Sequence, residues 1–228
     1  MERREIVALQ NLLKANDLIA EQINRRLTEE GVLLVDLISS PGAGKTTLIE
    51  RTKDLLPDLK FAVINGDVQT DRDARRLKEK GIPAVQIATG GECHLEAHMV
   101  EQVLDDVLSE RPDIIFIENV GNLICPSEFK LGEHLRAVLL SAPEGDDKPQ
   151  KYPLAFLTSQ VFLITKVDLV QHLPFDPERA KEDALSVNPK LRVIKVSALT
   201  GEGLDEWASL LKEELSRVRE NFSDKDER

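Results

Sequence analysis

The sequence predicts a three-layer α/β fold, in which a mostly parallel sheet carries helices on both faces and a further helix precedes the first strand. Apolar runs of strand length alternate with segments of helical period along most of the chain. Runs such as 32–38 and 114–117 are typical of strands that are buried on both faces. A glycine-rich turn separates the first of these runs from the helix that follows it.

The elements expected along the chain begin with a helix over residues 3–29, because an apolar stripe ends just before Gly31. Apolar runs predict strands at 32–38, 60–65, 84–88, 114–117, 136–141, 161–165 and 191–196. Helical periodicity predicts helices directly after residue 47 and at 71–80, 94–109, 177–186 and 204–219. Residues 142–153 are polar and predict a loop, and the charged residues 221–228 predict a disordered tail. The chain thus divides into a helix over 1–30, one domain over 31–220 and the tail.

Residues 39–47, Ser-Ser-Pro-Gly-Ala-Gly-Lys-Thr-Thr, have the composition and the position of a phosphate-binding loop. Glycine permits the backbone to wrap closely round an anion, and the N–H groups of the following helix start would face the phosphates. The expected nucleotide-binding residues are Pro41, Gly42, Ala43, Gly44, Lys45, Thr46 and Thr47. Ser39 departs from the usual pattern, which has glycine there. The sequence therefore predicts a P-loop NTPase, with Lys45 on the β- and γ-phosphates and the Thr46 hydroxyl on Mg²⁺.

Residues at two later strand ends predict that the nucleotide is GTP. Asp168, in Thr-Lys-Val-Asp after the strand at 161–165, can accept two hydrogen bonds from guanine, which adenine cannot offer. The stem of Lys166 would cover the base, and Ser197 and Ala198 would meet the guanine carbonyl. Thr165 stands where GTPases usually have asparagine, so the hydrogen bond from that side chain to the pocket backbone is left open.

Acidic residues at the ends of two further strands are expected to hold Mg²⁺ and to serve catalysis together with Lys45. Glu118 begins Glu-Asn-Val-Gly, which occupies the place of the Asp-x-x-Gly switch, and the Gly121 N–H would sense the γ-phosphate. Asp67 is either a third magnesium or catalytic residue or a turn residue after Gly66. Because no arginine finger is identifiable, slow GTP hydrolysis is expected.

Cys93, His94 and Cys125 form a second set of candidate ligands. They lie in two loops that leave strand carboxyl ends, so they can converge beside the nucleotide. Thiolate and imidazole suit Zn²⁺ or Ni²⁺, and three ligands fit a transferable ion or a site completed in a dimer. The alternative for either cysteine is a buried apolar side chain. His98, one helical turn after His94, either assists the metal site or is a solvated or partner-contacting residue.

The composition excludes several classes of protein. A net charge of −11 argues against nucleic acid as the main partner. No apolar run is long enough to span a bilayer and the first residues do not resemble a signal peptide, so a cytoplasmic protein without membrane contact is expected. Two cysteines are too few for a disulfide framework.

Taken together, the motifs resemble those of the HypB family, the GTPases that help to insert nickel into nickel–iron hydrogenase. The similar segments are SPGAGKTT (40–47), GDVQTD (66–71), TGGECHL (89–95), ENVGNLICP (118–126), EGDDKPQKYP (144–153) and SALTGEG (197–203). The resemblance implies a GTP-dependent homodimer, a metal site at Cys93, His94 and Cys125, a nickel metallochaperone as partner and a hydrogenase large-subunit precursor as client. It also implies a cycle between GTP and GDP. The nickel-binding cysteine-rich or histidine-rich N-terminus of some members is absent.

Two alternatives remain at this point. A urease accessory GTPase has the same chemistry, but usually has proline between its cysteine and histidine, whereas Cys93 and His94 are adjacent. A regulatory GTP-binding switch would need no metal, and its thiols would be structural. Residues 142–153 either form a solvated loop or reach the nucleotide of a dimer partner.

Overall fold

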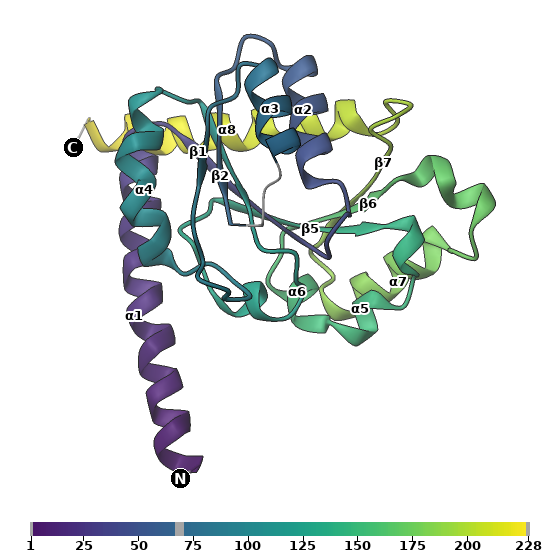
Figure 1. Cartoon of the computed structure of the whole chain (residues 1–228), viewed down its shortest axis with the longest axis horizontal. Coiled ribbons are helices and arrows are strands. Elements are labelled where there is room, and N and C mark those ends of the chain that lie inside the picture. Colours follow the sequence, from purple (N-terminus) through teal and green to yellow (C-terminus); the bar gives the residue numbers. More distant parts are fainter. Residues whose placement is uncertain (1, 67–70, 227–228) are drawn as a thin grey trace.

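A seven-stranded parallel sheet forms the centre of the molecule (Figure 1). The computed structural model describes residues 2–66 and 71–226, and the side chains of residues 10–66 and 75–221. The strands lie in the order β3-β2-β4-β1-β5-β6-β7, and every neighbouring pair is parallel. Their bounds are β1 Leu33–Ser39, β2 Phe61–Asn65, β3 Ala84–Gln86, β4 Ile114–Glu118, β5 Leu135–Ser141, β6 Val161–Thr165 and β7 Arg192–Val196. The predicted strands and the parallel sheet are confirmed.

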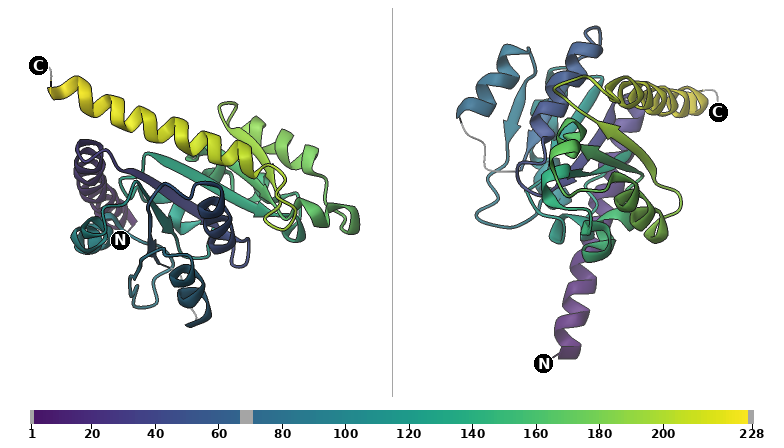
Figure 2. Two further views of the ribbon diagram at one scale, coloured as in Figure 1. Left: turned by 90° about the horizontal axis from the view of Figure 1, so that it is seen from above. Right: turned by 90° about the vertical axis from the view of Figure 1, so that its right-hand side faces the viewer.

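Helices cover both faces of the sheet, as the apolar strands require. The α-helices are α1 Glu2–Glu29, α2 Lys45–Leu55, α3 Asp71–Glu79, α4 Ala97–Ser109, α5 Lys148–Lys151, α6 Pro153–Leu157, α7 Pro177–Val187 and α8 Leu204–Asp226. Alternate residues of β1 face opposite layers: Leu33 belongs to the core formed with α2, α3 and α8, whereas Leu34 packs with α1 and α4. The helices α6 and α7 cover β5 and β6 on the second face. The three predicted layers are confirmed (Figure 2).

The N-terminal helix α1 packs on the domain through its second half. Ala20, Ile23 and Leu27 are buried against the domain. The first half extends beyond the sheet and its covering helices in both figures. The expected packing of this helix on the flank of the domain therefore holds for its C-terminal half.

Three expected boundaries are wrong. The loop expected at 142–153 contains a 3-10 helix, Ala142–Glu144, and the helices α5 and α6, because Ser141 and Glu144 form a capping box and prolines occupy first-turn positions. Helix α8 continues to Asp226 and does not end at residue 219, since no glycine or proline interrupts it, whereas the expected tail over 221–228 stays a prediction. Helix α4 begins at Ala97, three residues later than expected, because residues 94–96 stay extended or irregular beside the candidate metal site.

Candidate nucleotide and metal sites

The phosphate-binding loop connects the end of β1 at Ser39 to the start of α2 at Lys45. Gly42 and Gly44 have φ values of 76° and 104°, which L side chains rarely adopt, so the requirement for glycine is conformational. The Lys45 side chain is buried, and its Nζ donates to Ser39 Oγ at 3.2 Å. Serine in place of the usual first glycine thus holds the catalytic lysine candidate in the loop.

The two expected magnesium ligands that the structure describes are in direct contact. Thr46 Oγ1 donates to Glu118 Oε2 at 3.0 Å, and Glu118 is 3% exposed at the end of β4. The contact arises because β4 lies beside β1, which brings the end of β4 to the start of α2. Asp67 lies outside the described residues, so its two interpretations remain open.

A pocket of about 310 Å³ lies beside the phosphate-binding loop, where the base is expected. Its lining combines the loop with the two candidate base-binding segments: Ala43, Gly44, Thr47, Leu48, Thr165, Lys166, Asp168, Leu169, Val196, Ala198 and Leu199. Asp168 Oδ1 accepts a hydrogen bond from Ser197 Oγ at 2.5 Å, which fixes the carboxylate that is expected to read guanine. Phosphate-binding and base-binding candidates therefore share one cavity.

The base-binding loop is fastened to the phosphate-binding loop by two side chains. Thr165 Oγ1 donates to the Ala43 carbonyl oxygen at 2.7 Å, and Lys166 Nζ donates to the Gly42 carbonyl oxygen at 2.7 Å. The threonine that departs from the usual asparagine thus still makes a hydrogen bond to the pocket backbone. The sequence leaves open whether Thr165 bonds to the pocket backbone, and the structure contains this hydrogen bond.

The three candidate metal ligands come together at the same edge of the sheet. One ligand atom each of Cys93, His94 and Cys125 lies within 4.8 Å of the others. Cys93 Sγ is 3.7 Å from His94 Nδ1, and the His94 ring stacks on Phe129 with centroids 4.1 Å apart. Two thiols and an imidazole at this spacing fit one soft or borderline cation.

The pKa of the Cys93 thiol depends on its neighbour Cys125. A side-chain hydrogen bond with Cys125, followed by desolvation, raises the pKa of the Cys93 thiol. Two neighbouring thiols resist ionising together, and a bound cation reverses this because thiolate ligands are stabilised by its charge. Metal binding at this set would therefore release protons.

Residues 118–125 connect the two sites. Glu118 faces Thr46, the Asn119 N–H donates to the Leu37 carbonyl oxygen at 3.2 Å, and the Asn122 side chain donates to the Cys93 carbonyl oxygen at 3.3 Å. The segment ends at Cys125. One short stretch of chain thus contacts the magnesium candidates at its start and both metal-ligand loops at its end.

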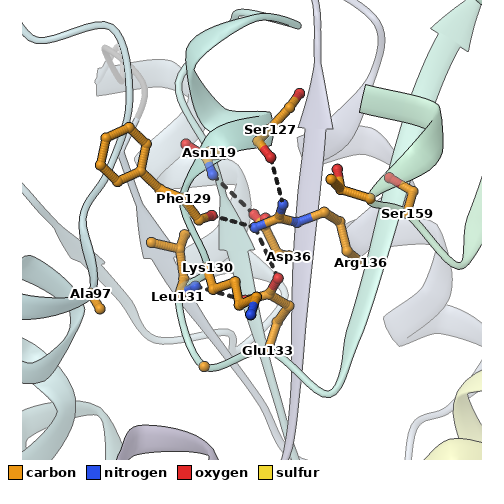
Figure 3. Close-up of polar contacts among 12 residues, drawn as sticks. Asp36, Ala97, Asn119, Ser127, Phe129, Lys130, Leu131, Glu133, Arg136 and Ser159 are labelled. Carbon is orange, nitrogen blue, oxygen red and sulfur yellow. Dashed lines mark hydrogen bonds and ion pairs between the residues drawn. The ribbon is translucent and has the colours of Figure 1, made fainter. Parts of the chain in front are cut away.

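A buried ion pair between Arg136 and Asp36 lies beside the start of this segment (Figure 3). Arg136 Nε donates to Asp36 Oδ2 at 2.9 Å, and Asn119 Nδ2 donates to Asp36 Oδ1 at 3.1 Å. Arg136 also pairs with Glu133 at 2.8 Å and donates to the carbonyl oxygen of Phe129. Burial raises the pKa of Asp36 to about 6, and the charge of Arg136 opposes this rise. The sequence does not predict this network. Its hydrogen bonds connect Asn119 and the backbone of Phe129 to Asp36 in β1 and Arg136 in β5.

Comparisons with known proteins agree with the geometry. The family model of the CobW/HypB/UreG nucleotide-binding domain matches residues 34–195. The hydrogenase maturation factor HypB of Rhizobium leguminosarum bv. viciae is 44% identical over 95% of this chain and 73% of its own length. The hydrogenase/urease maturation factor HypB of Helicobacter pylori is 39% identical over 97% of this chain and 92% of its own.

Solved structures show the same likeness. HypB of Archaeoglobus fulgidus superposes with a TM-score of 0.85 at 40% identity, covering 89% of this chain and all of the other. A crystal structure of Helicobacter pylori HypB in complex with nickel gives 0.82 at 42% identity, over 91% of this chain and 97% of the other. The signal recognition particle receptor FtsY of Elizabethkingia anophelis, 16% identical with a TM-score of 0.52 over 79% of this chain and 65% of the other, shares the fold alone.

The fold and the phosphate-binding loop define a P-loop GTPase, and Cys93, His94 and Cys125 lie close together at the same edge of its sheet. The chain belongs to the HypB family of hydrogenase maturation factors. The resemblance and the GTPase class that the sequence predicts are confirmed, and the urease accessory alternative is not favoured. Within the described residues, no helix is both long and apolar enough to cross a membrane.

Proposed function

We propose that this chain binds GTP with Mg²⁺, hydrolyses it slowly, and uses the change of nucleotide to control a nickel ion that it delivers during assembly of nickel–iron hydrogenase. The observation that carries the proposal is the convergence of Cys93, His94 and Cys125 within 4.8 Å at the end of the segment that begins at Glu118. Nickel is favoured because a relative with 42% identity over 97% of its chain is described as a complex with nickel. Zn²⁺ suits the same ligands and is the competing ion.

The hydrolytic site would work mainly by positioning and neutralising charge. Lys45 would hold the β- and γ-phosphates, and Thr46 and Glu118 would hold Mg²⁺ directly or through water. The Gly121 N–H would contact the γ-phosphate. Water then attacks the γ-phosphorus and GDP leaves, which needs an oriented water and little covalent chemistry from the protein. Asp67 remains a candidate for orienting that water or for binding Mg²⁺.

Loss of the γ-phosphate would release residues 118–125, because Gly121 lies at the centre of this segment. Cys125 at its end would then move relative to Cys93 and His94, which belong to another loop. A change in the spacing of three ligands alters metal affinity directly, because a cation requires specific ligand distances. The partners we propose are a second copy of this chain in the GTP state, a nickel metallochaperone and the hydrogenase large-subunit precursor.

The first test is the metal content of the purified full-length protein after incubation with Ni²⁺ and desalting, measured by mass spectrometry of the metal. We expect one ion per chain in the wild type and little or no retained metal in Cys93→Ala and Cys125→Ala, because each variant removes one of three ligands. Glu128→Gln is the matched control, because Glu128 is an exposed carboxylate in the same 3-10 helix as Cys125.

Equal metal content in the wild type and both cysteine variants would overturn the metal assignment. The protein would then be a guanine-nucleotide switch with structural thiols. GTP turnover measured on the same samples, with Lys45→Ala as the inactive reference, separates that outcome from a failure to fold.

A further inference from the structure

The imidazole of His94 lies between the thiol of Cys93 and the carboxylate of Glu96. Its Nδ1 faces Cys93 Sγ at 3.7 Å, whereas its Nε2 faces Glu96 Oε1 at 3.7 Å. The ring is stacked on Phe129 at 4.1 Å and an interplanar angle of 20°, and its side chain is only 16% exposed. Stacking and burial hold the ring in this orientation, so the nitrogen that is directed at the thiols is Nδ1.

The other nitrogen has no function in the metal-ligand set itself. Nε2 is buried and makes no hydrogen bond to any of the described residues. A buried polar atom without a partner costs free energy, and such atoms are rare in folded proteins. When one imidazole nitrogen binds a metal, the other carries the proton and donates it to a carboxylate, a carbonyl or water. A carboxylate oxygen of Glu96 lies 3.7 Å from Nε2 in this direction.

We propose that Glu96 is the positioning residue of the metal site: it accepts the Nε2–H of His94 when Nδ1 coordinates the ion. This inference rests on the proposed function of Cys93, His94 and Cys125 and assigns a role to a residue outside that set. The contact would shorten from 3.7 Å to about 2.8 Å, the usual length of a charge-assisted hydrogen bond. It would fix the tautomer of His94 and make its Nδ1 a stronger ligand.

The surroundings of Glu96 show that its side chain is not needed to start α4. Glu96 occupies the N-cap position, but its side chain makes no capping hydrogen bond. The N–H of Ala97 is instead satisfied by Asn16 Oδ1 of α1 at 2.8 Å. The second carboxylate oxygen of Glu96 pairs with His98 Nδ1 at 3.2 Å. The carboxylate is thus 17% exposed and held between two imidazoles, and His98 restrains it against rotating away from His94.

Two other interpretations make different predictions. Glu92, His94 and Glu96 also bring ligand atoms within 4.8 Å of one another, so Glu96 could instead be a direct ligand of a second ion. That arrangement would bind two ions per chain. A purely structural Glu96 would leave metal affinity unchanged in any variant that folds.

The test is a Co²⁺ titration of the full-length protein against a competing chelator, followed by visible and near-ultraviolet absorption. We expect Glu96→Ala to lower the affinity by about 10- to 100-fold, as loss of an outer hydrogen bond to a ligating histidine does. Glu96→Gln should lose less, because its amide oxygen still accepts the proton. In both variants the thiolate-to-cobalt absorption per bound ion should match the wild type, since both sulfurs remain. Glu101→Gln, an exposed residue one turn further along α4, is the control.

Wild-type affinity in Glu96→Ala, with an unchanged unfolding temperature of the metal-free protein, would overturn the inference. So would a second Co²⁺ per wild-type chain that disappears in Glu96→Ala, because Glu96 would then be a ligand. If the wild type itself bound no Co²⁺, the proposed metal function would fail, and this inference with it. The wild-type measurement therefore distinguishes the two failures.

Discussion

Asp168 offers a direct test of which base the nucleotide pocket reads. Its carboxylate lines the pocket of about 310 Å³ and is fixed by Ser197 Oγ at 2.5 Å. Guanine presents two adjacent donors, N1–H and the exocyclic amine, which a carboxylate accepts together. Asparagine has the same shape but replaces one acceptor by an NH₂ donor. Asp168→Asn therefore keeps the packing and changes only the pattern of donors and acceptors.

The magnitude follows from the two hydrogen bonds. Each bond to the charged carboxylate contributes about 1.5–3 kcal/mol, and a neutral replacement contributes about 0.5–1.5 kcal/mol. Asp168→Asn loses one bond and weakens the other, which together costs about 2.5–4.5 kcal/mol. At about 1.4 kcal/mol for each factor of ten, GDP affinity falls by roughly 60- to 1,600-fold. Xanthine has a carbonyl where guanine has the amine, so it matches asparagine and its affinity should rise.

Isothermal titration calorimetry with GDP and with xanthosine diphosphate measures both changes on one protein sample. Asp205→Asn is the matched control, because Asp205 is an exposed aspartate in the first turn of α8. Unchanged GDP affinity in Asp168→Asn would refute the assignment of Asp168. A loss of GDP binding without any gain for xanthosine diphosphate would refute the proposed hydrogen bonds between Asp168 and guanine. Asp168 would then have only a structural role.

Three further residues give predictions of stability. Burial lowers the pKa of His134 from 6.5 to about 4, so between these pH values the folded protein binds fewer protons than the unfolded chain. About 3 kcal/mol of stability that is present above pH 6.5 is therefore lost as the pH falls to 4. Urea unfolding should show this dependence of stability on pH in the wild type and not in His134→Gln. An alanine at Gly203 would place its Cβ 1.8 Å from the Lys195 carbonyl oxygen, in a backbone conformation with a φ of 70°. Gly203→Ala should therefore lower the free energy of unfolding by more than about 2 kcal/mol. An unchanged midpoint of urea unfolding would contradict this turn geometry. Thr165→Val removes the hydrogen bond to the Ala43 carbonyl oxygen and should cost about 1–3 kcal/mol of stability in thermal unfolding, whereas a stability equal to wild type would show that this contact contributes nothing.

The parts of the fold that the sequence predicts are those governed by local pattern. The run at 114–117 is apolar because β4 is buried on both faces, and Gly44 and Lys45 mark the turn and helix start by composition alone. Cys93, His94 and Cys125 could be grouped because parallel strands bring the loops at their carboxyl ends to one edge. Burial and connectivity therefore suffice for the layers and for the approximate place of both sites.

Contacts across the chain could not be predicted in this way. Asp36 lies inside an apolar run, and nothing in the sequence indicates that its partner is Arg136, which lies 100 residues away. The ring of Phe129 stacks on His94 although the two residues belong to different loops that are 35 residues apart in the sequence. Glu96 carries no motif, since its importance depends on the orientation of a neighbouring ring. The direction of a side chain and the pairing of distant residues depend on the tertiary structure, so they cannot be predicted from the pattern of a single sequence.

The central claim is that nucleotide and metal sites are linked through residues 118–125. The measurement that tests it most directly is the Ni²⁺ affinity of the full-length protein saturated with Mg²⁺ and either GDP or a non-hydrolysable GTP analogue. We predict affinities that differ by about fivefold or more, with the same factor appearing in the effect of Ni²⁺ on nucleotide affinity. Equal Ni²⁺ affinities in the two states would contradict the account.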